Sequence, residues 1–213
     1  DRLWADLESL GAIGRGGRGI SRLAFTPADL EGRRWLVSRM QEAGMQARID
    51  EVGNVVGEIP GQEPGPAIII GSHTDTVPEG GMFDGALGVL SGLEAVRSLA
   101  EAGVRLRHPL KVVSFANEEG SRIIPGTFGS RWMMGKVPDA EMSRLEPILA
   151  EAGLAGGAAP SAPICEGGCA SYFELHIEQG GILDAAGEDI GVVTGIVWIT
   201  SFTATFKGMA NHA

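Results

Sequence analysis

The chain has 213 residues, which is enough for one substantial domain, or for one domain and the beginning of another. Hydrophobic residues make up 44% of it, so the chain can bury a core and disorder is not expected. Asp and Glu total 27 against 17 Lys and Arg, which gives a net charge of -10. An acidic surface repels phosphate groups, which argues against nucleic acid and against an anionic membrane surface as partners.

Several features bear on where the protein resides. No apolar run approaches the roughly 20 residues that span a bilayer, and the charged start Asp1–Trp4 is not typical of a signal peptide. The two cysteines, Cys165 and Cys169, are too few for a disulfide framework. We therefore expect a cytoplasmic protein. Residues 207–213 end without a helix cap or a charged tail, so we expect a piece of a longer chain.

The first quarter of the chain predicts two helices and two strands. Leucines recur at helical spacing over residues 2–10. Thr26 as N-cap and Pro27 in the first turn predict a helix that runs to about Ala43. Residues 45–59 are typical of two short strands.

The remaining segments predict an α/β fold. The short apolar run Ala67–Ile70 is typical of a strand buried on both faces. Strands alternating with helices indicate a layered α/β architecture. We expect further strands at residues 111–116, 172–177 and 195–206, and helices at residues 86–102 and 139–152.

Polar clusters accompany three of the predicted strands. His73 and Asp75 follow the first, Glu118 and Glu119 follow the second, and His176 lies in the third. In α/β sheets, ligand sites form in the crevice at the carboxyl ends of the strands. The three clusters can therefore converge, although they are far apart in the sequence.

These residue types suit a hydrolytic metal site. Imidazole and carboxylate are ligands for Zn, Mn, Co or Ni. Asp84 lies just before an expected helix, and such a carboxylate can bridge two ions about 3.5–4 Å apart. Asp75 is two residues from His73 on the same face of an extended segment, so it can accept the second ring N–H. The neighbours Glu118 and Glu119 point in different directions, so one can bind metal while the other takes a proton from water.

Each residue alone has an ordinary structural explanation. A single His is more often a surface or core residue, which is how we interpret His108. The pair Glu118–Glu119 alone would more often be solvated, and Asp84 alone would more often be an N-cap. The combination reverses this interpretation, because charged groups at the ends of buried strands are costly without a partner. A metal site accounts for all of them.

Competing motifs are weaker. Gly14-x-Gly16-x-x-Gly19 matches a dinucleotide-binding pattern, but it follows a helix rather than a strand and no helix begins on it. The sequence contains no nucleophile elbow, His-Glu-x-x-His motif or P-loop. Cys165 and Cys169 lack the second pair that a zinc site would need.

Several segments resemble the amidase/hydantoinase/carbamoylase family of zinc-peptidase-like enzymes. That family includes allantoate amidohydrolases, N-carbamoyl-L-amino-acid hydrolases and β-ureidopropionases. The likeness extends over nearly the whole chain, and its most specific parts are Asn117–Arg122 and Glu174–Gly180. The segments that carry it are Gly71–Val77, Phe83–Gly85, Asn117–Arg122, Glu174–Gly180 and Asn211–Ala213.

The resemblance implies a metal centre and a base. His73 and His176 would each bind one of two divalent ions, with Zn expected and Mn, Co or Ni as alternatives. Asp84 would bridge the ions, Glu119 would bind one of them, and Glu118 would be the catalytic base. From its spacing to His73, we also expect Asp75 to be a catalytic residue.

The resemblance also implies a domain organisation. A mixed-sheet, three-layer α/β catalytic domain would occupy residues 1–199, and residues 200–213 would begin an inserted α+β lid that forms a homodimer. Gln179 would line the substrate pocket, and His212 would reach the substrate from the lid. The family supplies a further His ligand and a carboxylate-binding Arg from segments later than residue 213. Ile123 also departs from the family, where Phe is more usual.

We therefore expect a hydrolase of linear amide or ureido C–N bonds. Its substrate would be a small ureido or carbamoyl acid, such as allantoate or an N-carbamoyl-L-amino acid. One alternative is a metallo-exopeptidase of the same superfamily. Another is a non-catalytic fragment that binds metal or dimerises.

Overall fold

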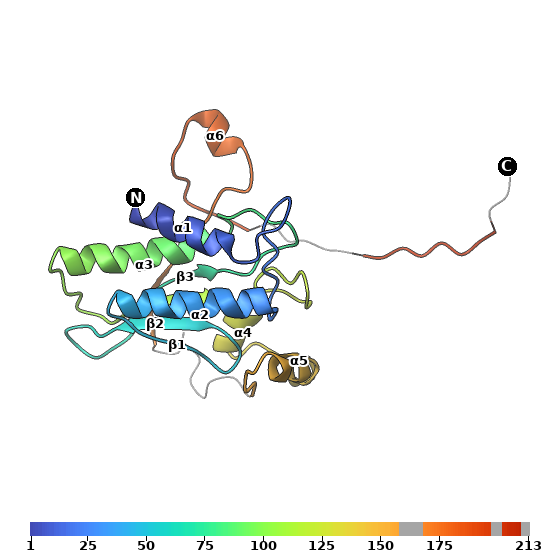
Figure 1. Ribbon diagram of the computed structural model, residues 1–213, viewed down its shortest axis with the longest axis horizontal. Helices are drawn as coiled ribbons and strands as arrows, with labels where there is room; N and C mark the ends of the chain where they lie inside the picture. The colour runs from blue at the N-terminus through green and yellow to red at the C-terminus, as the bar shows by residue number, and fades with distance from the viewer. Residues whose placement is uncertain (158–167, 197–201, 210–213) are drawn as a thin grey trace. The chain divides into compact units, whose positions relative to one another are not determined.

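The computed structural model describes residues 1–157, 168–196 and 202–209. The chain divides into two compact units, Asp1–Ile177 and Glu178–Ala213. The second unit contains the short helix α6 (Ile182–Ala186). The elements of the first unit are α1 (Arg2–Ala12), α2 (Pro27–Glu42), β1 (Gln46–Ile49), β2 (Val55–Ile59), β3 (Ala67–His73), α3 (Ala86–Glu101), β4 (Leu110–Phe115), α4 (Phe128–Met133), α5 (Asp139–Glu151) and β5 (Cys169–Phe173) (Figure 1).

The strands form one mixed sheet in the order β1-β2-β4-β3-β5. β3 pairs in parallel with β4 on one side and with β5 on the other, whereas β1, β2 and β4 are antiparallel neighbours. His73, the last residue of β3, is in register with Phe115, the last residue of β4. The parallel strands therefore end at one edge of the sheet, which confirms the predicted mixed α/β sheet.

Alternating side chains of the strands enter two separate cores. Val55 and Val112 pack with α1, α2 and α3, whereas their neighbours Val56 and Val113 pack with α4 and α5. All four are buried. Because successive side chains of a strand point to opposite faces, a strand that is apolar at every position can have helices on both sides. The sheet is thus the middle of three layers in the first unit.

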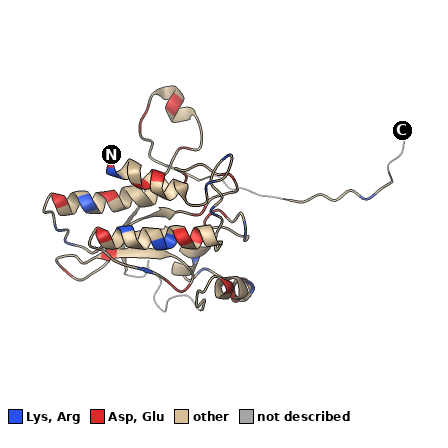
Figure 2. Ribbon diagram, in the orientation of Figure 1, with Lys and Arg blue, Asp and Glu red and all other residues tan. Residues whose placement is uncertain are grey.

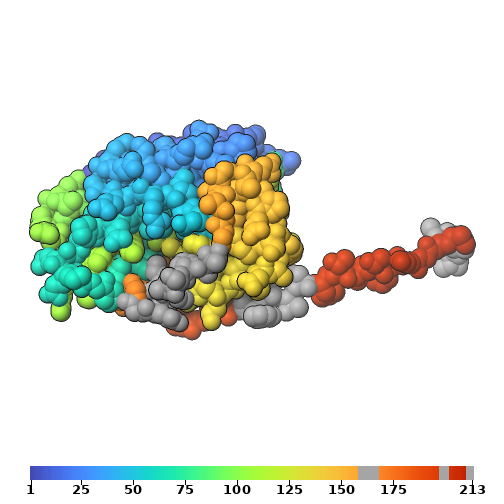
Figure 3. Space-filling view, turned by 90° about the horizontal axis from the view of Figure 1, so that it is seen from below, coloured from blue at the N-terminus to red at the C-terminus, as the bar shows by residue number. Residues whose placement is uncertain are grey.

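The loop after α5 returns to the antiparallel side of the sheet. The backbone N–H of Gly156 donates to the carbonyl of Glu51 at 2.8 Å. In Figure 3 the orange residues of this loop lie against the blue and cyan residues of the α2–β2 region. This contact fixes the α5 layer to the turn between β1 and β2.

Charged side chains connect α1 to α3. Arg2 pairs with Glu94 at 2.6 Å, and the buried Asp6 pairs with Arg97 at 2.5 Å. Both α2 and α3 carry acidic and basic residues (Figure 2). None of the helices in residues 1–157, 168–196 and 202–209 is long and apolar enough to cross a membrane.

The predicted helices and the first four strands agree with the structure, the fifth strand is shifted, and the sixth stays a prediction. The strand expected at 172–177 lies at Cys169–Phe173, so His176 follows it in a loop. The next residue after Phe173, Glu174, contacts β3 through its side chain, whose carboxylate accepts from Ser72 Oγ. The strand expected at 195–206 is not formed by the described residues of that range, whose side chains are exposed.

Candidate metal centre

His73 ends β3 with its ring turned toward the sheet edge. The side chain is buried, and Nδ1 lies 3.0 Å from the backbone carbonyl of Asp75. A carbonyl can only accept, so Nδ1 carries the proton and the lone pair of Nε2 is available. Nε2 lies 3.6 Å from Glu118 Oε2 and 3.9 Å from Asp84 Oδ1. His73 therefore presents a ligand nitrogen to two carboxylates.

Asp75 acts differently from the expectation that its carboxylate accepts the His73 ring N–H. Asp75 Oδ1 is 3.8 Å from His73 Nδ1, and the main-chain carbonyl of Asp75 accepts the hydrogen bond from the ring instead. The carboxylate accepts the backbone N–H groups of Glu118 and Glu119, each at 3.2 Å. Burial raises the pKa of the Asp75 carboxyl. Asp75 thus connects the end of β3 to the segment that follows β4.

Gly85, between Asp84 and α3, allows the His73 ring to lie beside the helix. Its φ of +63° belongs to the left-handed region that favours glycine. A Cβ at this position would lie 2.4 Å from the Cδ2 and Nε2 atoms of His73. The sequence pattern includes Gly85 only as part of the segment Phe83–Gly85. A glycine between a candidate metal ligand, Asp84, and the start of a helix is the sequence feature that could have indicated this role.

His176 reaches the same point from the loop after β5. Its Nδ1 lies 2.8 Å from its neighbour's carbonyl, so Nε2 again has the lone pair, and Nε2 is 3.2 Å from Asp84 Oδ1. Ligand atoms of His73, Asp84 and His176 all lie within 4.8 Å of one another. The predicted convergence of the strand-end clusters is therefore present for His73 and His176, and Asp84 lies beside both; their metal-binding roles stay predictions.

Two contacts hold the loop of His176 in place. Glu174 accepts from Ser72 Oγ at 2.8 Å and from the Tyr172 hydroxyl at 2.6 Å. A Cβ on Gly88 of α3 would lie 2.3 Å from the carbonyl oxygen of Leu175. Glu174 and Gly88 are therefore supporting residues that the sequence patterns did not single out.

The residues after β4 complete the cluster of acids. Asn117 has a φ of +49° and donates from Nδ2 to the carbonyl of Ile123 at 3.0 Å, which turns the chain before Glu118. Burial raises the pKa of the Glu118 and Glu119 carboxyls, and nearby acids add to the effect on both. Glu119 Oε1 is buried and has no hydrogen-bond partner among the residues that the structure describes.

This donor set fits divalent metal ions. Two imidazoles turn their lone pairs to the Asp84 carboxylate, and the buried Glu119 Oε1 has no donor within the described part of the chain. Burial raises the pKa of the Glu118 and Glu119 carboxyls because it removes water from their charged forms. A bound cation would stabilise those charged forms. Imidazole with carboxylate suits Zn and the neighbouring transition metals.

The structure does not test the two predicted substrate residues. Gln179 belongs to the second unit, where the adjacent Glu178 carboxylate accepts the N–H groups of Ile182 and Leu183 at the start of α6. His212 lies outside the described residues. Their roles stay predictions.

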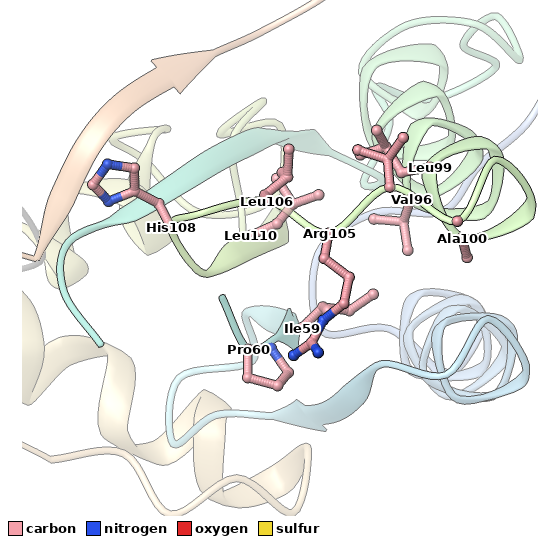
Figure 4. Close-up of a pocket in the computed structure, with 11 residues that line it drawn as sticks. Ile59, Pro60, Val96, Leu99, Ala100, Arg105, Leu106, His108 and Leu110 are labelled. Atoms are coloured by element: carbon pink, nitrogen blue, oxygen red, sulfur yellow. The ribbon is translucent and has the colours of Figure 1, made fainter. Parts of the chain in front are cut away.

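A hollow of about 340 Å³ lies at the opposite end of the sheet from the acids and imidazoles. Its walls are apolar residues from the C-terminal part of α3 and the ends of β2 and β4, with Arg105 reaching toward Pro60 and Ile59 (Figure 4). His108 lies at its edge, and its Nδ1 is 3.1 Å from the carbonyl of Pro66. None of the clustered acids lines this hollow.

Comparison with known proteins identifies the family. The sequence pattern of peptidase family M20/M25/M40 matches residues 69–211, which contain every residue of the cluster described above. The chain belongs to peptidase family M20/M25/M40.

Relatives within this M20 family also confirm the resemblance to hydantoinase/carbamoylase enzymes. The chain is 40% identical to an N-carbamoyl-L-amino acid amidohydrolase of Geobacillus stearothermophilus, over 100% of this chain and 54% of the relative. It is 36% identical to an allantoate amidohydrolase of Bacillus subtilis, over 92% of this chain and 49% of the relative. The chain thus spans about half the length of the curated relatives it matches.

A solved structure gives the same result for the fold. A hydantoinase/carbamoylase family amidase from Burkholderia ambifaria matches with a TM-score of 0.78 and 41% identity. The match covers 87% of this chain and 47% of the other. The three-layer arrangement around the mixed sheet is therefore that of an M20 family carbamoylase-type fold.

Proposed function

We propose that the whole protein hydrolyses a linear amide or ureido C–N bond in a small carboxylic acid. The observation that carries the proposal is the meeting of His73, Asp84 and His176 within 4.8 Å, with Glu118 Oε2 3.6 Å from the His73 ring. A base beside a set of metal ligands is the arrangement that metal-assisted hydrolysis requires.

The metal ligands in this proposal are His73, His176, Asp84 and Glu119. His73 and His176 would each hold one of two divalent ions, and Asp84, which lies near both rings, would contribute its carboxylate to both. Glu119 supplies its buried Oε1. When bound, the ions polarise the substrate carbonyl and make water more acidic.

The proton transfers fall to Glu118. Its carboxylate accepts a proton from the attacking water and returns it to the departing nitrogen, so one group serves both transfers. The Asp75 carboxylate accepts the N–H groups of Glu118 and Glu119, and so it fixes the backbone positions of the proposed base, Glu118, and the proposed ligand, Glu119. The raised pKa of Glu118 brings its basicity closer to that of the groups it must exchange protons with.

The substrate class rests on the relatives. Two of them are named for N-carbamoyl-L-amino acids and for allantoate, and both names describe ureido acids. Gln179 and His212 are proposed to contact the substrate, His212 from a lid that begins near residue 200. We also propose that the whole protein is a homodimer through that lid.

A substrate panel tests the proposal. The full-length protein, loaded in turn with Zn, Mn, Co or Ni, is assayed with allantoate, N-carbamoyl-L-amino acids, 3-ureidopropionate and dipeptides. We expect turnover of at least one ureido acid and release of its nitrogen product. Turnover of dipeptides alone would instead assign the protein as an exopeptidase, and metal binding without any turnover would make the site non-catalytic.

A further inference from the structure

Arg22 lies in the loop between α1 and α2, and its side chain is buried, with 1% exposed. Its guanidinium donates to three backbone carbonyls. Nε donates to Thr74 at 2.7 Å, and Nη1 donates to Leu10 at 2.8 Å and to Ile13 at 2.9 Å. The side chain therefore connects the C-terminal end of α1 to the segment that follows His73.

The backbone of Arg22 contacts the same segment. Its N–H donates to Thr76 Oγ1 at 2.9 Å, and its carbonyl accepts the N–H of Thr76 at 3.0 Å. One peptide unit next to Asp75 is thus held through the Thr74 carbonyl, and the other through the Thr76 N–H. Because these two peptide planes flank Asp75, holding both of them fixes the direction in which its Cα–Cβ bond points.

This direction matters for the candidate base. The Asp75 carboxylate accepts the backbone N–H groups of Glu118 and Glu119, and the Asp75 carbonyl lies 3.0 Å from Nδ1 of His73. A displacement of Asp75 would therefore move a proposed ligand and the proposed base together. Small displacements of catalytic groups have large kinetic effects.

Arg22 differs from other buried arginines of the chain. Arg97 bonds to the carboxylates of Asp6 and Glu94, and Arg33 bonds to Asp29. Among the described residues, the hydrogen bonds of the Arg22 guanidinium go to backbone carbonyls. A buried cation is costly unless its hydrogen bonds are made. Burial lowers the pKa of Arg22 to about 10, so the side chain is charged at neutral pH.

We propose that Arg22 is a positioning residue that orients Asp75 and, through it, Glu118 and Glu119. The inference rests on the proposed function only in assigning Glu118 as the base. A planar guanidinium can reach the three carbonyls from one position, whereas the ammonium of a lysine is a single point and cannot reproduce this fork.

The test compares Arg22→Lys and Arg22→Met with Arg97→Lys and Arg97→Met in the full-length protein. The Arg97 variants are the matched control, because they also alter a buried arginine but lie on the α1–α3 contact. Three quantities are measured: kcat and KM separately, the midpoint of thermal unfolding, and hydrogen exchange of the Glu118 and Glu119 amides in metal-free protein.

We expect Arg22→Lys to lower kcat by about tenfold or more with KM changed by less than about threefold. The Glu118 and Glu119 amides should exchange about tenfold faster, because their acceptor is no longer held. The Arg97→Lys variant should leave both readouts unchanged even if it unfolds at a lower temperature.

Two results would overturn the proposal. One is unchanged kcat and amide exchange in Arg22→Lys. The other is the same change in the Arg97 variants, which would show a general loss of stability. If Arg22→Met does not fold, Arg22→Lys decides. If the parent protein has no turnover, the proposed function fails, but the exchange comparison still decides the role of Arg22.

Discussion

Glu118→Gln in the full-length protein is expected to lower kcat by about 10²–10⁴, equivalent to about 3–5 kcal/mol of activation free energy. The amide keeps the size of the side chain but cannot accept a proton from water. Metal content should stay at the level of the parent, because Glu118 is not among the proposed ligands. Steady-state kinetics with the best ureido substrate and elemental analysis of the same preparation measure both quantities.

Glu63→Gln provides the control for this change. Glu63 is an exposed acid that pairs with Arg107; the two lie before the starts of β3 and β4, whereas His73 is at the end of β3. The same loss of charge there should leave kcat within a factor of about two, since exposed ion pairs contribute little. Near-normal turnover by Glu118→Gln would remove Glu118 from the mechanism.

The pH profile gives the same prediction a second readout. Burial raises the pKa of Glu118 above its ordinary value, and the base is active only when ionised. Activity of the parent should therefore fall as the pH drops through this raised pKa, and it should recover as the pH rises. The residual activity of Glu118→Gln should lack that acidic limb.

Gly85→Ala is expected to remove most metal binding and activity. The new Cβ would lie 2.4 Å from Nε2 of His73, the atom proposed to bind the ion, so the ring must move. The residue also has a φ of +63°, where a side chain costs about 1–2 kcal/mol. We expect metal affinity and kcat each to fall by about 10²-fold or more, since a misplacement of about 1 Å has effects of that size.

Gly81→Ala is the matched control, because it lies in the same loop and a Cβ there would meet nothing within 4 Å. Metal titration of the metal-free protein and thermal unfolding compare the two variants. Gly81→Ala should bind metal like the parent. Parent-like metal affinity in Gly85→Ala would mean that the His73 ring does not need its present position.

Much of the fold follows from local sequence patterns. The N-cap at Thr26, the buried apolar run of β3 and the periodicity of α3 predict their elements within a few residues. The end of β5 was not predictable in this way, because apolar residues recur after Phe173, at Leu175 and Ile177. The pairing of β5 with β3, and the bond between Glu174 and Ser72 beside it, are contacts across about 100 residues, which local patterns do not reveal.

The candidate site shows the same limit. The strand-end rule predicts that His73 and His176 meet, because it depends only on strand direction, whereas Asp84 precedes a helix and does not follow from this rule. It does not predict which atoms of Asp75 bond to which partners, and the expected carboxylate–imidazole bond is a carbonyl–imidazole bond instead. Nor does it predict the role of Gly85, since a forbidden Cβ is visible only when a ring from another element lies beside it.

The metal content of His73→Ala and His176→Ala is the most direct test of whether these two imidazoles bind metal. His108→Ala is the control, because this imidazole lies beside the carbonyl of Pro66, at the edge of the hollow at the opposite end of the sheet. Each full-length variant is loaded with Zn, dialysed and measured by elemental analysis beside the parent. We predict that His73→Ala and His176→Ala each lose bound metal while His108→Ala retains it. Unchanged metal content in His73→Ala and His176→Ala would contradict the assignment of these imidazoles as ligands.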